Sequence, residues 1–479
     1  MLYGSTFPSA CPYRKCNNEI KYASRILLVI AAVTKFSYKH GLWLVARINY
    51  CKYIIFAERL PLPSLTVQNA NPSLSLPLLF SFGCITIISN NCQIIKGAAT
   101  VMDKKSVTTL TLKQINKHTV YQYIYRQRET SKFQIVQDLN MGLSTVSQNL
   151  TTLEKEGLIE RNGYFASTGG RKAQIIRIVP DLRIAIGIGI LKTMFHLVAV
   201  DLYGEAVARE TIPLAYEDTP EYYDTFAGEV LHFIEKNEYP TEKISGISIA
   251  TQGIISPDGS SVTYGAIMGN TRMQLSDFAS RLPFPCHLVH DSKTAADLEL
   301  WNHPKLDSAL VFLLNRNLGG AVITNHSVHQ GFSMHSGSLE HICVEPDGPV
   351  CYCGNRGCLE TFCSANALEL RSGLSVKEFF LKLRDPDNSG EHLQDIWQDY
   401  LRHLAFAIRN LNLLIDCPVI LSGYLAPYFL PEDLDRLLAL INEHTPFPLA
   451  KDSLLTGTHG QYTPAIGAAL FYVKNFLDT

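Results

Sequence analysis

Short apolar segments alternate with helical segments from Pro180 onward, and this alternation limits the possible folds more than any other feature of the chain. The apolar runs of strand length are 184–190, 197–201, 244–250, 286–289, 310–314 and 321–324. Strands that interleave with helices are typical of layered α/β domains. A chain of 479 residues, 46% of them hydrophobic, can bury more than one core. We therefore predict an α/β body of two lobes, preceded by further modules.

Charged side chains are distributed unevenly along the chain, although the formal net charge is only −2. Residues 1–101 carry 10 basic and 2 acidic side chains, residues 102–178 carry 12 and 6, and residues 179–479 carry 20 and 36. A basic module ahead of an acidic body indicates a small nucleic-acid reader joined to a domain that does not itself favour a phosphate backbone.

Residues 1–101 show no persistent amphipathic period. Their longest apolar stretch, 76–88, contains Pro77 and Gly83 and is shorter than the roughly 20 residues that a membrane span needs. A basic start ahead of an apolar run could be a signal sequence, but no small-residue cleavage site follows it. We expect an atypical extension outside the functional fold, with the functional protein starting at Met102 and no membrane partner. A membrane anchor is the alternative.

Residues 102–178 have the pattern of a winged helix-turn-helix. The helix containing Val120 and Ile124 is followed by a capped helix from Ser131, a Met-Gly turn at 141–142 and a further helix. The residues that the helical spacing places inward in the last two helices are Phe133, Val136, Leu139, Leu143, Val146, Leu150 and Leu153. Two short strands, near 157–161 and 175–178, would form the wing.

The second of these helices carries a row of small hydroxyl and amide side chains that can contact bases and phosphates in a major groove. The residues predicted to face outward are Ser144, Thr145, Ser147, Gln148, Asn149 and Thr151. Arg171 and Lys172, after a Gly-Gly pair, fall where the tip of a wing meets the DNA backbone or minor groove. The alternative is a solvated polar face. The preceding helix and turn, the net charge of this module and the basic tip favour DNA binding.

A cysteine cluster with metal-binding spacing lies in the second lobe. Cys351, Cys353 and Cys358, with His341, supply three thiolates and one imidazole, which can close a tetrahedral structural zinc site. Cys343 and Cys363 are left out as ligands. Clustered thiols of this kind indicate a reducing, cytoplasmic setting.

These motifs together resemble the ROK family, named for repressors, open reading frames and kinases, over nearly all of residues 110–479. The resemblance implies a bilobal actin- and hexokinase-like (ribonuclease H-like) body with a sugar cleft between its lobes, preceded in the repressors by a winged helix-turn-helix. The boundaries that we expect are 102–178 for the DNA-binding domain, 179–300 for lobe 1, 301–455 for lobe 2 with the zinc site, and 456–479 for a C-terminal helix that returns to lobe 1.

The resemblance also implies a set of sugar-binding residues. Asp291 matches the family's general base, and His290 stands where Asn is usual. In the family's Glu-x-Gly-His element, Ser338 replaces the Glu, Glu340 replaces the Gly, and His341 is retained. The implied set is Asn270, His290, Asp291, Ser338, His341 and Glu360. The alternative for Asp291 is a carboxylate that only caps a helix.

The phosphate loops of the family's kinases are degenerate here. Segment 187–191 lacks the Asp and Thr of the first motif, 315–319 keeps only the last Gly of the second, and the adenosine-side glycine pair is reduced to Gly423. We therefore expect a protein that senses a sugar and does not phosphorylate it.

The functional prediction is a sugar-responsive transcriptional regulator, by family default a repressor, of carbohydrate uptake or catabolism such as xylose metabolism. Its expected partners are double-stranded operator DNA, a sugar or sugar phosphate effector, and further copies of itself in a dimer or tetramer. Two alternatives remain open. One is a sugar kinase with an appended DNA-binding domain, and the other is a ligand-blind DNA-binding or scaffold protein, suggested by Ser338 and Glu340.

Overall fold

The computed structural model describes residues 109–166, 172–385 and 391–478, together with four short strands nearer the N-terminus. These strands form two antiparallel pairs, β1 (Arg47–Asn49) with β2 (Tyr53–Ile55) and β3 (Leu79–Ser81) with β4 (Cys84–Thr86). The other expectations for residues 1–101, and the one for Arg171, lie outside the described residues. None of the helices that are described combines the length and the apolar character that a membrane crossing requires.

The chain divides into two compact units, residues 1–114 and 115–479. Three helices and a two-stranded antiparallel sheet precede the body: α2 (Thr109–Gln127), α3 (Lys132–Asp138), α4 (Leu143–Lys155), β5 (Ile159–Tyr164) and β6 (Gln174–Ile178). Helix α3 begins at a capping box in which the Ser131 hydroxyl accepts from the Gln134 amide, while the Gln134 side chain accepts from the Ser131 amide. The predicted break between the first two helices is therefore encoded locally.

Three predictions about the faces of these helices are wrong. Phe133 is 65% exposed, and Ile135 is the fully buried residue of α3. Two residues turn a helix by about 200°, so Phe133 points away from the side on which Ile135 packs. Leu143 is 57% exposed because it is the first residue of α4, whereas Asn149 is buried at 3%. Asn149 lies three residues from Val146 and four from Leu153, so its position on the helix places it inside despite its polarity.

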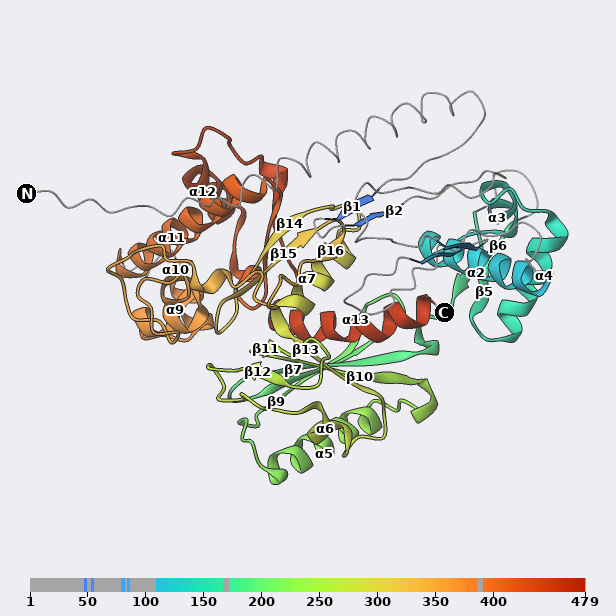
Figure 1. The fold of residues 1–479 in the computed structure, drawn as a ribbon, viewed down its shortest axis with the longest axis horizontal. Coiled ribbons are helices and arrows are strands. Elements are labelled where there is room, and N and C mark those ends of the chain that lie inside the picture. Colours follow the sequence, from blue (N-terminus) through green and yellow to red (C-terminus); the bar gives the residue numbers. More distant parts are fainter. Residues whose placement is uncertain are drawn as a thin grey trace, which may run out of the picture. The chain divides into compact units, whose positions relative to one another are not determined.

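Two five-stranded sheets form the body (Figure 1). The strands of the first are β7 (Ile184–Ile190), β8 (Phe195–Val200), β9 (Ala206–Ile212), β10 (Ile244–Thr251) and β13 (Cys286–His290). The strands of the second are β14 (Ala309–Leu313), β15 (Gly319–Thr324), β16 (Ser327–Val328), β17 (Val419–Ser422) and β18 (Leu454–Thr456). A hairpin of β11 (Ile254–Ile255) and β12 (Val262–Tyr264) accompanies the first sheet.

Both sheets have the same topology. Their orders are β13-β10-β7-β8-β9 and β16-β15-β14-β17-β18, so each has its first strand in the centre, an antiparallel meander on one side and two parallel strands on the other. Each predicted apolar run corresponds to a strand, and the run 184–190 coincides with β7. All seven residues of β7 are buried, as a continuous apolar run in a central strand requires.

Helices connect and cover the sheets. The α-helices of the body are α5 (Pro220–Lys236), α6 (Leu275–Ala279), α7 (Asp291–Asn302), α8 (Glu360–Cys363), α9 (Ala365–Ser372), α10 (Val376–Leu383), α11 (Glu391–Ile415), α12 (Pro431–Asn442) and α13 (Thr463–Leu477). The 3₁₀ helices are η1 (Pro180–Leu182), η2 (Thr241–Lys243), η3 (Leu339–His341), η4 (Ala426–Tyr428), η5 (Lys451–Ser453) and η6 (Gly460–Tyr462).

Helix α13 packs closely against β7 and α7. A Cβ on Gly187 of β7 would lie 1.9 Å from the Ala465 carbonyl oxygen, and one on Gly467 would lie 1.9 Å from the Thr294 carbonyl oxygen. The far end of α13 belongs to the same apolar core as Val120 and Ile124 of α2. Gln122 of α2 also donates to the Leu477 carbonyl oxygen over 2.6 Å. One helix therefore contacts both the first sheet of the body and the helices that precede it.

Candidate binding site, metal centre and DNA-reading surface

The carboxyl ends of three parallel strands meet beside Asp291. Ile190 of β7 pairs with Thr251 of β10, and Thr251 pairs with His290 of β13, so the three strands end together. Asp291 follows at once as the first residue of α7. In open α/β sheets, this edge is where ligands bind. The arrangement places His290 and Asp291, both predicted to bind a sugar, at that edge.

Asp291 is a buried carboxylate with some partners of its own. Its Oδ1 accepts from the Ser292 amide at 2.7 Å and from the Ser292 hydroxyl at 3.2 Å, and the Nε2 of His290 lies 3.6 Å away. Burial raises the pKa of Asp291 and lowers the pKa of His290. The two bonds from Ser292 come from the adjacent residue and are not the bonds of a helix cap, which come from amides two or three residues further on, and the position of Asp291 at a sheet edge suits ligand contact.

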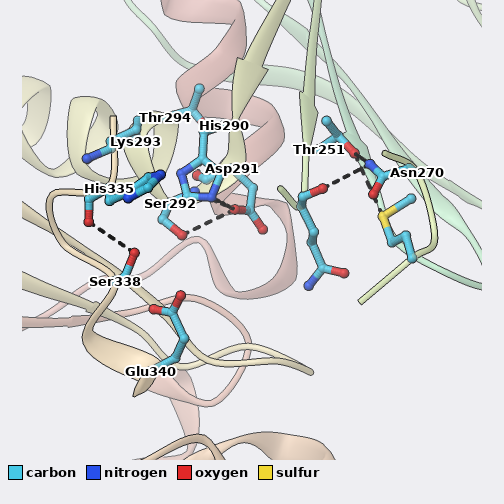
Figure 2. A network of polar contacts seen from close by, with 12 residues as sticks. Thr251, Asn270, His290, Asp291, Ser292, Lys293, Thr294, His335, Ser338 and Glu340 are labelled. Carbon is cyan, nitrogen blue, oxygen red and sulfur yellow. Dashed lines mark hydrogen bonds and ion pairs between the residues drawn. The ribbon is translucent and has the colours of Figure 1, made fainter. Parts of the chain in front are cut away.

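Asn270 lies near the same edge and is 1% exposed. Its Nδ2 donates to the Thr251 hydroxyl at 3.1 Å and to the Gln252 carbonyl at 2.9 Å, as Figure 2 shows in part. Its Oδ1 is buried without a hydrogen-bond partner among the described residues. Asn270 is therefore held firmly by β10 and keeps one acceptor unused.

The opposite wall comes from the second lobe, at η3. Ser338 is exposed, and its hydroxyl donates to the His335 carbonyl at 3.0 Å. Glu340 is more enclosed, with 15% of its side chain exposed. Figure 2 shows its carboxylate directed toward the side on which Asp291 and Ser338 lie. Burial, reinforced by the charges of Asp291 and Glu360, raises the pKa of Glu340 to about 8. The wall thus presents Glu340 as well as the predicted Ser338.

Glu360 is buried at the start of α8 and holds a loop of its own lobe. Its Oε1 accepts from the Asn317 amide group at 2.8 Å, and its Oε2 accepts from the Leu318 backbone amide at 2.6 Å. Burial raises the pKa of Glu360 to about 7. Both oxygens therefore accept hydrogen bonds from the loop at Asn317 and Leu318. Glu360 holds this loop in place, in addition to any contact with a ligand.

A small cavity lies between Asp291 and the segments aligned with phosphate loops. It holds about 220 Å³ including its opening, and its walls come from Gly189, Ile190, Leu191, His196, Ala250, Asp291, Asn315, Gln461 and Pro464.

His341, Cys351, Cys353 and Cys358 form a cluster that can hold a metal ion, with ligand atoms within 4.8 Å of one another. Cys353 Sγ lies 3.7 Å from Cys358 Sγ, and Cys351 Sγ lies 3.8 Å from His341 Nδ1. A tetrahedral ion with metal–sulfur bonds of about 2.3 Å separates its sulfur ligands by about 3.8 Å. The donor set and its spacing therefore fit the predicted metal.

Backbone geometry folds the loop around this cluster. Gly354 and Gly357 have φ values of 90° and 67°, and a Cβ on Gly357 would lie 1.5 Å from the Glu345 carbonyl oxygen. Cys343 and Cys363 lie apart from the cluster, with thiols near the carbonyl oxygens of Arg356 and Tyr400. The structure thus places together the four predicted ligands.

The predicted DNA-reading residues divide between surface and core. Ser144, Gln148 and Thr151 of α4 are exposed, and Thr145 and Ser147 are partly exposed. The Ser147 hydroxyl donates to the Leu143 carbonyl and accepts from Lys132 Nζ at 3.2 Å. Lys172 is exposed ahead of β6, whereas Asn149 is buried and cannot reach DNA from its present position. The face of α4 that can contact DNA thus contains fewer residues than predicted.

Two polar residues of the body were not singled out from the sequence. Lys293 is buried, and its Nζ donates to the carbonyl oxygens of His329, at 3.0 Å, and of Ser336. His196 is buried in β8, where its Nδ1 lies 2.9 Å from the Thr211 hydroxyl. A single histidine in an otherwise apolar strand was a usable signal. The role of Lys293 depends on a loop remote in sequence.

Comparison with known proteins identifies similar chains of several kinds. The family model described as ROK family matches residues 183–475. The DNA-binding transcriptional dual regulator NagC of Escherichia coli K12 is 28% identical over 265 residues, which cover 54% of this chain and 65% of NagC. The xylose repressor of Bacillus subtilis is 26% identical over 383 residues, which cover 77% of this chain and 97% of that repressor. The match therefore spans less than two thirds of NagC.

Solved structures show the same fold. A ROK family transcriptional regulator, a homologue of the E. coli MLC protein, superposes with a TM-score of 0.58 at 17% identity, covering 77% of this chain and 97% of that one. A ROK family glucokinase from Streptomyces griseus, in complex with glucose and AMPPNP, superposes with a TM-score of 0.52 at 19% identity, covering 60% and 98%. The body therefore has the actin- and hexokinase-like fold that the sequence predicted.

Proposed function

The chain belongs to the ROK family, and we propose that it is a sugar-responsive, DNA-binding transcriptional regulator, a repressor of carbohydrate uptake or catabolism genes. The observation that carries this proposal is the extent of the similarity to the xylose repressor. That similarity covers 97% of the repressor and is longer than the segment matched by the family model. The similarity therefore extends beyond the ROK body. It favours a regulator more strongly than a similarity limited to the fold of that body would.

We assign DNA recognition to residues 102–178 as a winged helix-turn-helix. Support comes from the two short helices α3 and α4 across a tight turn, followed by the β5-β6 hairpin. Ser144, Gln148 and Thr151 would face the major groove, and Lys172 would contact the phosphate backbone. Arg171 would add a second charge at the wing tip. Two such readers in a homodimer or tetramer would bind two half-sites of an operator.

We assign effector binding to the edge of the first sheet and the facing η3 wall. Asp291, His290 and Asn270 would contact a sugar from one side, and Ser338, His341 and Glu360 from the other. Because a polyol offers several hydroxyl donors, the buried carboxylate of Asp291 suits it as an acceptor. A zinc ion held by His341 and the three cysteines would keep the second wall in place and, with four protein ligands, would have no open position for catalysis.

Helix α13 offers a physical link between these two functions. Pro464 of α13 contributes to the cavity that Asp291 lines, and Leu477 at its other end accepts from Gln122 of α2. The ring of Tyr125 also stacks on Tyr203 at 5.3 Å. A ligand that changes how the lobes close would shift the position of α13. Through α13 it would change the spacing of the two DNA-binding domains.

A sugar kinase is the second candidate, favoured by the likeness to a glucokinase and by the place of Asp291. The surroundings of the first phosphate segment speak against it. Gly187, which the sequence aligned with a phosphate loop, lies in β7, and a Cβ there would meet the Ala465 carbonyl oxygen at 1.9 Å. That glycine serves helix packing.

The test is a DNA-binding titration of the full chain with fragments of its own upstream region, at several salt concentrations, with and without a panel of hexoses and pentoses. The expected result is salt-sensitive binding that one sugar weakens, and loss of the sugar effect but not of DNA binding in Asp291→Asn. Absence of binding to every fragment would remove the proposal's main support. Consumption of ATP with any of the same sugars, abolished by Asp291→Asn, would establish the kinase instead.

A further inference from the structure

One oxygen of the Glu340 carboxyl group has no hydrogen-bond partner in the described part of the chain. Its Oε2 is buried without a hydrogen-bond partner, and its Oε1 lies 3.8 Å from the Nε2 of His341, which is beyond hydrogen-bond range. An unsatisfied buried polar group costs about 1–3 kcal/mol, and a charged one more. A buried polar atom without a partner is commonly explained by a functional role or by a bound water molecule or ion.

The polar groups around Glu340 are engaged elsewhere. The ammonium of Lys293 donates to the carbonyl oxygens of His329 and Ser336. The hydroxyl of Ser338 donates to the carbonyl oxygen of His335. Glu360 uses both of its oxygens on the loop at Asn317 and Leu318. These groups therefore hold loops of the second lobe and none of them donates to Glu340, although the charge of Lys293 lies near enough to lower the pKa of Glu340.

The backbone under Glu340 is fixed on both sides. Leu339 is buried against β15 so tightly that a Cβ on Gly320 would lie 2.4 Å from its Cγ. His341 on the other side is part of the metal cluster. Since neither neighbour can yield easily, the backbone at Glu340 is held in place. A group held in this way is preorganised for whatever binds it.

We propose that Glu340 contacts the effector and determines which sugar binds. A bound sugar would then be contacted by two carboxyl groups, Asp291 from the first lobe and Glu340 from the second. The inference rests on the proposed sugar sensing and deepens it. The ligand would carry neighbouring hydroxyl or amino groups, because these groups can hydrogen-bond to a carboxyl group whether it is ionised or protonated.

The rival explanation is that Glu340 orients His341 for the metal, since carboxylates often hold metal-binding histidines. The 3.8 Å separation speaks against it. The two explanations differ in measurable ways. Loss of an orienting residue should lower metal content and stability, whereas loss of a ligand-binding carboxyl group should leave both intact and remove an unsatisfied buried polar atom from the ligand-free protein.

The experiment uses the full chain as wild type, Glu340→Gln and Glu340→Ala, with Asp347→Asn as a control that alters an exposed carboxylate of the same loop. Binding of D-xylose, D-glucose, N-acetyl-D-glucosamine and D-glucosamine is measured by calorimetry and thermal shift. Metal content and DNA affinity are measured on the same samples. For the sugar that binds wild type, we expect both Glu340 variants to lose about tenfold or more in affinity. Metal content and DNA affinity should stay at the wild-type level. The ligand-free melting temperature should be equal to that of wild type or higher.

Two results would overturn the inference. One is sugar affinity equal to wild type in both variants, and the other is a joint fall of metal content and ligand-free melting temperature. A larger loss for D-glucosamine than for D-glucose would support it and assign an ammonium to Glu340, and equal losses would support it and assign a hydroxyl. If wild type itself binds no sugar of the panel, the proposed sensing fails and this inference fails with it. That outcome is distinguishable because the wild type, not the variants, shows it.

Discussion

Two glycine-to-alanine changes in helix interiors should have opposite effects on stability. Gly467 of α13 faces α7, where an added Cβ would lie 1.9 Å from the Thr294 carbonyl oxygen. Gly228 of α5 has nothing within 4 Å of the same added atom. Alanine is favoured over glycine in a helix by about 1 kcal/mol, so both variants receive the same intrinsic gain. The difference between them isolates the close packing of α13.

The magnitude for Gly467→Ala follows from the overlap. Ordinary Cβ contacts begin near 3.4 Å, so α13 and α7 would have to separate by more than 1 Å. Overpacking of this kind costs about 1–3 kcal/mol or more, against the gain of about 1. We expect a net loss of about 2 kcal/mol for Gly467→Ala and a gain of about 0.5–1 kcal/mol for Gly228→Ala. For the compact unit 115–479, unfolding entropy of about 2 cal/mol/K per residue converts 1 kcal/mol to about 1.3 °C, so the melting temperature should fall by about 2–3 °C in the first and rise by about 1 °C in the second.

Thermal unfolding of the full chain, followed by circular dichroism and by calorimetry, measures both shifts. Because α7 begins with Asp291, Gly467→Ala should also weaken the response to sugar in the DNA-binding titration. Equal melting temperatures for Gly467→Ala and wild type would refute the close packing, as would a destabilised Gly228→Ala.

Three further outcomes are expected. Cys353→Ser should reduce metal content and weaken the sugar response more than DNA affinity, whereas equal loss of both would indicate general unfolding. Lys172→Ala should weaken DNA binding for all sequences and lower the salt dependence by about one phosphate contact, and an unchanged salt slope would remove Lys172 from the interface. Burial lowers the pKa of His196 to about 4 from its ordinary 6.5, so the unfolded chain takes up the proton first. The stability that His196 contributes above pH 6.5 should therefore be lost as pH falls toward 4. Between pH values of about 7.5 and 5, wild type should lose about 2 kcal/mol more than His196→Gln, and identical pH profiles would contradict this.

Several features of the molecule could be predicted from the sequence because they depend on neighbours along the chain. The run 184–190 is apolar throughout, and only a buried central strand accommodates such a run. The capping box at Ser131 and Gln134 joins residues three positions apart. The thiols of Cys351, Cys353 and Cys358 are close in sequence, so glycine turns between them were enough to predict a metal site.

Other features were decided only by tertiary packing. Asn149 is buried and Phe133 exposed because the direction from which α4 and α3 are covered depends on the neighbouring elements and not on polarity. Gly187 matched a phosphate segment in the sequence, yet it serves the approach of α13, which comes from nearly 280 residues further along the chain. No local pattern contains that contact.

The candidate site shows the same division. The sequence by itself determined that Asp291 follows a strand and that Glu340 stands beside a metal-binding histidine, since both are matters of adjacency. Only the tertiary structure decided which carboxylates are free. Glu360 is satisfied by a loop more than 40 residues earlier, while Glu340 Oε2 has no hydrogen-bond partner among the described residues, and Lys293 and Ser338 donate to carbonyl groups. Hydrogen-bond satisfaction depends on every group that folding brings within about 3 Å, and such groups come from distant parts of the chain.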